Sequence, residues 1–207
     1  MFLTENPYLS ARRQMLRHAC TVALTIGCAA AIAEKPEGEQ LLFATPPGWH
    51  EAYADRVDNL STTEYVPDGE TVDDWQEMLT VQVLVDKPKA DPDAILSAAV
   101  KHLYSECETY AAQPIELGGV GDYPTLGVMS MCGSSKEDSD GRFILLRGIA
   151  GDENFYLLQK AWRTEPFNPD EEEPPVDLDQ RKFWLGFLAF LRVCNPGAGN
   201  CPKAPSE

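Results

Sequence analysis

The chain has 207 residues and a formal net charge of −16, with 17 basic and 33 acidic side chains. A surface this acidic repels phosphate backbones and anionic lipid headgroups, which excludes nucleic acid and an anionic membrane surface as partners. Hydrophobic residues make up 43% of the chain, which is enough for one ordinary globular domain at this length.

The first 33 residues are predicted to be a secretory signal peptide. Arg12, Arg13 and Arg17 precede an uncharged run over 19–33, which ends in the small-x-small pattern that signal peptidase recognises. The run is too short, and too rich in Ala, Thr and Gly, to span a bilayer. We therefore expect a periplasmic or secreted chain whose mature part has no transmembrane segment.

Three variants of this leader remain open. Cys28 in the sequence TIGC fits a lipoprotein acylation site, although Thr25 is a poor residue for the apolar position three before the cysteine. The sequence of residues 11–17 fits a twin-arginine signal, but that route exports folded proteins and disfavours disulfide formation before export. Met15 can replace Met1 as the start of a shorter signal.

Four cysteines follow the predicted signal peptide: Cys107, Cys132, Cys194 and Cys201. An even number in an exported chain predicts two disulfides, for which three connectivities are open. We favour Cys107–Cys132 and Cys194–Cys201, because each pair is close in sequence and the second closes a turn-rich loop. A four-cysteine metal site is disfavoured because the chain contains no Cys-x-x-Cys pair.

The first half of the domain is predicted to be a strand meander. Strands are expected over 40–44, 50–57, 61–66 and 78–85, with a Pro-Gly turn over 45–49. Thr71, three residues before Asp74, resembles a capping box and predicts a short helical turn that carries Trp75. In the last strand alternate residues share one face: Leu79, Val81, Val83 and Val85.

The second half is predicted to hold two helices around further strands. Asp91 and Pro92 begin the first helix, whose apolar stripe ends at Cys107. Strands are expected over 113–120, 123–132, 142–149 and 155–162, followed by a charged loop over 166–175. Asp177 caps the last helix, and its predicted buried stripe is Phe183, Trp184, Phe187, Leu188 and Leu191.

This element order predicts an α+β fold with a mainly antiparallel sheet flanked by helices. Residues 34–193 are expected to form a single globular domain. Residues 194–207 are expected to form a C-terminal tail closed by the second disulfide.

The turn formed by Pro47, Gly48 and Trp49, in the sequence FATPPGW, opens this element order. Together with the meander, central helix, second antiparallel run and C-terminal helix, it resembles the PsbP-like α/β/α sandwich superfamily over 40–193. The resemblance implies a sandwich fold and a non-enzymatic accessory or assembly role. The four cysteines are an addition to that pattern, and no functional residue is carried over.

Residues 64–77 carry six carboxylates: Glu64, Asp68, Glu70, Asp73, Asp74 and Glu77. They do not fit a calcium-binding EF-hand loop, because Val72 and Asp73 stand where an oxygen ligand and the invariant glycine are required. A looser calcium site formed by Asp68, Glu70, Asp73 and Asp74 remains open. The other interpretation is an acidic turn that leads into a buried strand. The acidic run over 170–173 is open to the same choice, between a basic partner and a solvated loop.

The sequence predicts no catalytic residue, no metal site and no cofactor. His50 and His102 are the only histidines after the leader, and no serine lies in a Gly-x-Ser-x-Gly motif. Trp49, Trp75 and Arg163 are the candidate binding residues, as a cluster on the surface of the domain.

We therefore expect an exported, non-catalytic binding or accessory protein. Its predicted partner is an unidentified protein or a small apolar ligand. Two alternatives remain open: a hydrolase that depends on carboxylates or a divalent metal, and an acidic inhibitor or immunity-type protein.

Overall fold

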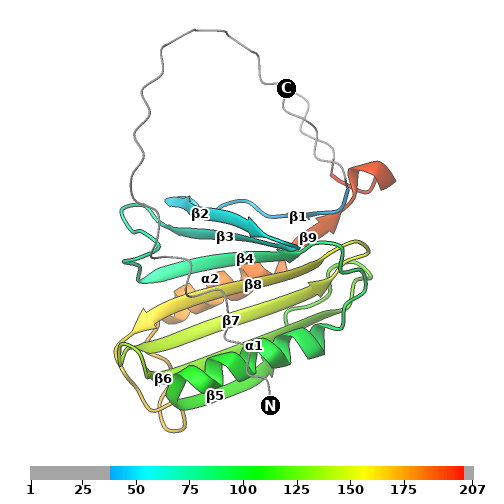
Figure 1. Ribbon diagram of the computed structural model, residues 1–207. Coiled ribbons are helices and arrows are strands. Elements are labelled where there is room, and N and C mark those ends of the chain that lie inside the picture. The colour runs from blue at the N-terminus through cyan, green and yellow to red at the C-terminus, as the bar shows by residue number, and fades with distance from the viewer. Residues whose placement is uncertain (1–37, 203–207) are drawn as a thin grey trace, which may run out of the picture. The chain divides into compact units, whose positions relative to one another are not determined.

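The computed structural model describes residues 38–202; the predicted signal peptide, with Cys28 and Met15, lies outside them. Its centre is a seven-stranded sheet in which every neighbouring pair is antiparallel (Figure 1). The strands, in order across the sheet, are β2 (Trp49–Val57), β3 (Leu60–Pro67), β4 (Glu77–Leu84), β8 (Phe155–Thr164), β7 (Gly141–Ala150), β6 (Thr125–Ser135) and β5 (Cys107–Ile115).

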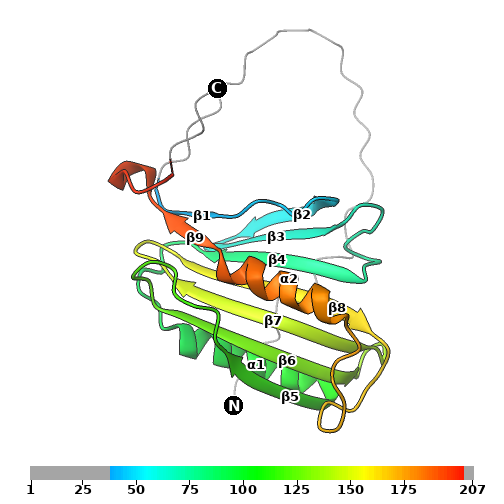
Figure 2. The ribbon, with the colours of Figure 1, turned by 180° about the vertical axis from the view of Figure 1, so that it is seen from behind.

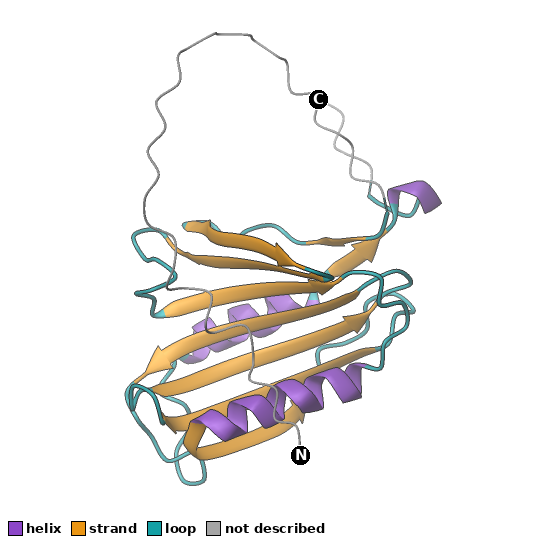
Figure 3. Cartoon of the chain, viewed as in Figure 1, coloured by secondary structure: helices purple, strands orange, loops and turns teal. Residues whose placement is uncertain are grey.

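Two helices lie on opposite faces of this sheet. Helix α1 (Pro92–Glu106) packs on β5, β6 and β7, and helix α2 (Leu178–Ala189) crosses the other face (Figures 1 and 2). The three layers are also visible when the chain is coloured by secondary structure (Figure 3). The predicted α+β class, with an antiparallel sheet flanked by helices, is therefore confirmed.

Both helices begin where the capping residues predict. The Asp91 side chain accepts a hydrogen bond from the backbone N–H of Asp93 at 3.0 Å. The Asp177 carboxylate accepts from the N–H groups of Asp179 and Gln180 at 2.9 and 3.1 Å. Each carboxylate satisfies donors that the first helical turn leaves unpaired.

Strands β7 and β8 are buried on both sides because a helix covers each face of the sheet. Along β7, alternate residues point to opposite cores, so that Leu145 faces α2 and Leu146 faces α1. The core on the α2 face includes Leu79, Phe143, Leu145, Leu158, Trp184 and Leu188. The core on the α1 face includes Leu96, Ile144, Leu146, Phe155 and Leu157.

A smaller sheet joins the two ends of the described chain. Strand β1 (Gln40–Leu42) pairs with β9 (Arg192–Cys194), and the short 3-10 helix η2 (Pro196–Ala198) follows. The carboxylate of Glu39 accepts hydrogen bonds from the N–H of Asp152 and the hydroxyl of Tyr156, at 2.7 and 3.2 Å. The start of the described chain is therefore fixed to the β7–β8 turn.

The predicted helical turn at Thr71 does not form. The Thr71 hydroxyl does accept a hydrogen bond from Asp74 N–H at 3.1 Å, but residues 72–74 are bends. Glu70 accepts from the N–H groups of Gln76 and Glu77, and β4 begins at Glu77. The N–H groups of Gln76 and Glu77 therefore bond the Glu70 carboxylate, and only a short segment separates Thr71 from the start of β4, so no helical turn forms.

The predicted strand over 113–120 is wrong in its second half, because β5 ends at Ile115. The next residues form a loop that is held by Arg147, a fully buried residue of β7. Its guanidinium donates to the carbonyl oxygens of Leu117 and Gly118 at 2.8 and 2.7 Å. These carbonyls bond a side chain and not a neighbouring strand, which ends the pairing.

The predicted buried stripe of α2 is correct except at its edge. Trp184 and Leu188 are buried and Phe187 is half-buried, but Phe183 is 53% exposed. Leu191 is buried as predicted but lies beyond Ala189, the last residue of α2. Phe183 lies one position before Trp184, which rotates it away from the sheet.

The predicted disulfide connectivity is confirmed. Cys107 bonds Cys132 with Cα atoms 5.6 Å apart, and Cys194 bonds Cys201 with Cα atoms 4.9 Å apart. Two such bonds indicate an oxidising, extracytoplasmic environment. Within residues 38–202, no helix has the length and apolar character needed to cross a membrane.

Candidate functional site

The structure brings two of the three candidate binding residues together. The guanidinium carbon of Arg163 lies 4.7 Å from the ring centroid of Trp75, within the range of a cation–π contact. Trp75 is half-buried against the α1-face core. Arg163 is the second-last residue of β8. The Nε of Arg163 is 3.6 Å from a carboxylate oxygen of Asp140, so the guanidinium is held between an aromatic ring and an acid.

The third candidate, Trp49, lies on the opposite face of the sheet. Its ring packs against the α2-face core, with the centroid 5.0 Å from that of Trp184. Trp49 is the first residue of β2 and pairs with Pro67, which shares the face of Tyr65. The alternation of side chains along the strands therefore separates Trp49 from Trp75 and Arg163.

Trp49 belongs to a tryptophan cage, formed by Trp49, Trp162 and Trp184, that surrounds the ammonium of Lys160. The Lys160 Nζ lies 4.9, 4.1 and 4.8 Å from the three ring centroids, in that order. Lys160 is completely buried, and its ammonium donates to the Glu77 carboxylate at 2.8 Å and to the Ala161 carbonyl at 3.1 Å. The cage joins β2, β8 and α2 through one cation.

Burial lowers the pKa of Lys160 to about 8, and the attraction of Glu77 opposes that change. The Lys160 side chain is 0% exposed in this arrangement, so the cage is a packing contact inside the fold. The sequence contained a signal for it that was missed. Lys160 alternates with Tyr156, Leu158 and Trp162 on the inward side of a strand that is buried on both faces.

The acidic segment over 64–77 is divided among separate contacts. Glu77 pairs with Lys160, Glu70 caps the start of β4, and Asp68 lies 3.5 Å from His50. In the part of the chain that the structure describes, no three His, Cys, Asp or Glu side chains are grouped so as to hold a metal ion. The looser calcium site thus has no assembled ligand set among residues 38–202.

The α1 face of the sheet also carries a set of polar side chains on strands against which α1 does not mainly pack. We call this set the polar strip; its members are half-buried and lie on β3, β4 and β8: Thr62, Thr80, Gln82 and Gln159. Cross-strand pairing places them on one face, since Gln82 lies opposite both Thr62 and the α1-face residue Leu157. Helix α1 packs instead on β5, β6 and β7.

Aromatic and cationic groups stand at the margins of the polar strip. Trp75 and Arg163 lie at the end where β8 finishes and β4 begins, and the Arg163 N–H donates to the Gln76 carbonyl at 2.9 Å. Tyr53 of β2 pairs with Glu64, which places it on the same face, and it is 39% exposed. The structure therefore gathers a tryptophan, an arginine and a tyrosine around a polar sheet surface.

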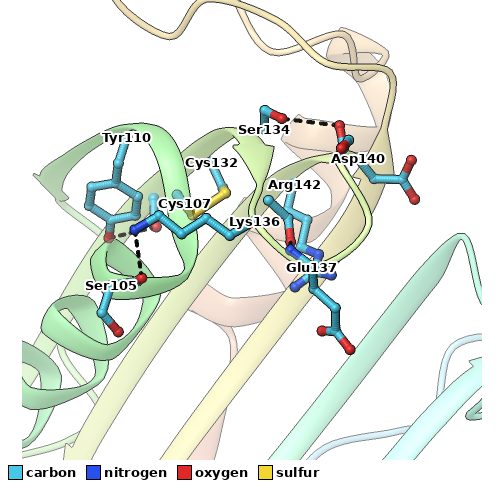
Figure 4. The surroundings of a disulfide bond; sticks show 12 residues. Ser105, Cys107, Tyr110, Cys132, Ser134, Lys136, Glu137, Asp140 and Arg142 are labelled. Atoms are coloured by element: carbon cyan, nitrogen blue, oxygen red, sulfur yellow. Dashed lines mark hydrogen bonds between the residues drawn. A yellow bond between two sulfur atoms is a disulfide. The ribbon is translucent and has the colours of Figure 1, made fainter.

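The Cys107–Cys132 disulfide joins the first residue of β5, which is also the C-cap of α1, to β6 (Figure 4). Beside it, the Lys136 ammonium donates to the Ser105 carbonyl at 3.0 Å, and the Lys136 N–H donates to the Glu106 carbonyl at 2.8 Å. These bonds satisfy carbonyls at the C-terminal end of the helix, where a positive charge is also favourable. The disulfide and Lys136 together fix the C-terminal end of α1 against the sheet.

Comparison with known proteins leaves the geometry as the basis for function, because no protein-family model and no curated protein matches this chain.

Proposed function

We propose that this chain is an exported, non-catalytic binding or accessory protein whose partner protein docks on the polar strip. The observation that carries the proposal is the Trp75–Arg163 contact at the margin of that strip. Tryptophan, tyrosine and arginine are enriched among the few residues that dominate the binding energy of protein interfaces. Here all three types border a sheet surface that α1 leaves to the side.

The chemistry of the strip favours a protein over a small apolar ligand. Its threonine and glutamine side chains offer hydrogen-bond donors and acceptors spread across three strands. A polar partner surface can pair with such groups, whereas an apolar ligand would leave them unsatisfied. The net charge of −16 favours a partner with a basic surface, because complementary charge speeds encounter.

The compartment follows from the disulfides. We place the mature chain in the periplasm or outside the cell, after cleavage behind Ala33, with lipid attachment at Cys28 as the lesser alternative. We also propose membership of the PsbP-like superfamily. The order of elements, the helix on each face and the turn at Gly48, whose φ of 77° favours glycine, support that placement.

Two carboxylates in the core region, those of Glu77 and Glu39, give the hydrolase alternative no support. Glu77 is bonded to the buried Lys160, and Glu39 is bonded to the β7–β8 turn. Both acids are occupied by structural partners.

Site-specific photo-crosslinking in cells tests the proposal. A photoreactive amino acid at Gln82 should yield an adduct with a protein, and the adduct should disappear in the W75A/R163A double variant. The same amino acid at Lys182, which is exposed on α2, is the matched control and should not yield that adduct. Equal adducts from both positions, or an adduct at Gln82 that survives the double variant, would overturn the assignment of this surface.

A further inference from the structure

Helix α1 covers only part of its side of the sheet. It packs on β5, β6 and β7, and among residues 38–202 it is the only α-helix on this side (Figure 1). The same side of β2, β3 and β4, which we call the open face, therefore has no helix of its own. Neighbouring strands are about 4.8 Å apart, so the open face spans about 10 Å, which is the diameter of one helix.

An apolar row crosses one end of the open face. Val57 lies opposite Leu60, and Leu60 lies opposite Leu84 on the next strand. Leu84 in turn lies opposite Phe155, which belongs to the α1-face core. Leu60 and Leu84 are half-buried, and Val57 is 50% exposed. The α1-face core thus continues onto the open face as a row of three side chains, which ends at an exposed valine.

The open face is therefore divided into an apolar end, a polar middle and an aromatic end. The polar strip occupies the middle, and Tyr53 borders it on β2. Trp75 and Arg163 lie at the other end, where β4 begins. The eight residues of β4 separate the two ends by about 25 Å, at about 3.3 Å per residue. A helix that rises 1.5 Å per residue covers this distance in about 16 residues.

We propose that the partner protein contributes one amphipathic helix of about 16 residues, which lies along β3 and β4 beside α1. This inference rests on the docking surface proposed above and adds the form of the element that occupies it. A helix suits the open face in width and in length, and it is the element that covers the rest of this side of the sheet. Its apolar residues meet the apolar row and Trp75, and its polar residues meet the polar strip between them.

The charges of the open face favour a helix with basic residues. Asp55 lies opposite Thr62, and Glu64 lies opposite Thr80, so both acids are on the same side of the sheet as the polar strip. The positive charge of Arg163 is already offset by Asp140, 3.6 Å away. Lysine or arginine beside the apolar stripe of the partner helix complements this arrangement.

A partner strand added to the edge of the sheet is the main alternative. Strand β2 is an edge strand, but its register shifts between Glu51 and Tyr53. Such a bulge, and charged side chains such as Glu51 and Asp55, protect an edge against pairing with another strand. A helix that lies on the open face requires no backbone pairing with β2.

Mapped photo-crosslinks test the form of the partner element. A photoreactive amino acid is placed in turn at Leu84, Gln82 and Thr80, which follow one another on the open face of β4 about 6.6 Å apart. Mass spectrometry then locates the linked residue in the captured partner. A helix moves this residue by about four positions for each step, because it rises 1.5 Å per residue. A strand moves it by about two positions, and an irregular surface gives unrelated segments.

These outcomes separate the helix from the docking surface itself. Adducts at strand-like spacing, or in unrelated segments, overturn the helix and leave the docking surface in place. The absence of any adduct at Gln82 overturns both.

The variant V57E tests the apolar row. It should lower the yield of the Gln82 adduct at least ~5-fold, because a carboxylate replaces an apolar anchor. L178E is the matched control, since Leu178 is 53% exposed at the start of α2 on the other side of the sheet, and it should change the yield less than ~2-fold. Thermal unfolding verifies that both variants fold. A V57E yield equal to that of the wild type would show that the partner does not reach the apolar row, which overturns a helix of this length.

Discussion

The two faces of the sheet carry the same chemical pair, a cation over an indole ring, in two different environments. On the α2 face, Lys160 is 0% exposed inside the tryptophan cage, and on the α1 face Arg163 is 23% exposed over Trp75. The two cations are three residues apart on β8 and therefore point to opposite faces. The buried contact joins β2, β8 and α2 inside the core, whereas the half-exposed one borders the surface on which we propose that a partner docks.

The difference arises from what covers each face at this end of the sheet. Helix α2 brings Trp184 over Lys160, and β2 adds Trp49 from the side. On the α1 face, the helix packs on β5, β6 and β7 and leaves the polar strip of β3, β4 and β8 to one side. The contrast can be tested by breaking each attachment in turn.

The largest effect is expected from breaking the disulfide between β5 and β6 that follows α1. Removing the Cys107–Cys132 bond, in C107S/C132S, should lower the free energy of unfolding by about 3.5 kcal/mol in the chain-entropy model. The bond closes a sequence separation of 25, and the Cys194–Cys201 bond closes only 7. C194S/C201S is the matched control and should cost about 1 kcal/mol less in urea unfolding. Equal losses would show that loop length does not decide the difference.

The next effect concerns the charge inside the tryptophan cage. E77Q leaves the buried ammonium of Lys160 without its carboxylate and should lower the free energy of unfolding by about 3 kcal/mol. K160M removes the cation itself and should remain within about 1 kcal/mol of the wild type, since an apolar side chain of similar volume suits the site. Urea unfolding followed by tryptophan fluorescence measures both. A K160M variant less stable than E77Q would mean that the cation–π contacts outweigh the burial of the charge.

A smaller effect is expected from pH. The pKa of Lys160 is about 8 in the folded chain and 10.5 ordinarily, so between these values the unfolded chain binds more protons. Stability from this group should therefore rise with pH, by on the order of 1 kcal/mol between about pH 7 and pH 9. The contribution is lost as pH falls through the folded pKa. The measurement is the difference in urea midpoint between the wild type and K160M, and a difference that stays constant with pH would contradict it.

The same comparison controls for the tyrosines. Burial raises the pKa of Tyr65, Tyr110 and Tyr123, so their contribution is lost as pH rises toward and beyond 10. The wild type and K160M both retain these tyrosines, so the difference between their urea midpoints reports the titration of Lys160 alone.

The effect on stability at the half-exposed pair is expected to be below that of E77Q. W75A/R163A should lower the free energy of unfolding by only about 1 kcal/mol for the cation–π contact, plus the packing of one half-buried ring. Its main effect should appear in partner binding, as described for the crosslink at Gln82. Thermal unfolding beside the crosslinking assay separates the two readouts. A loss of stability as large as that of E77Q would place Trp75 with the cage as part of the architecture.

Local signals in the sequence determined most of the fold. Asp91 with Pro92, and Asp177, begin helices because their carboxylates satisfy free N–H groups of the first turn. Alternating apolar residues placed β4, and cysteine spacing favoured the observed pairing of both disulfides. The capping and alternation signals act within a few residues, so the sequence alone was sufficient for these elements.

Only the tertiary structure decided the rest, because it depends on contacts between distant residues. The strand expected at 113–120 ends early because Arg147 takes two of its carbonyls. Trp49 and Trp75 look alike in the sequence, yet the pleat of β2 places one in the Lys160 cage and the bend before β4 places the other beneath Arg163. The first indole is packed in the α2-face core and the second is half-buried at the edge of the α1-face core, and this difference in burial is a property of the assembled layers.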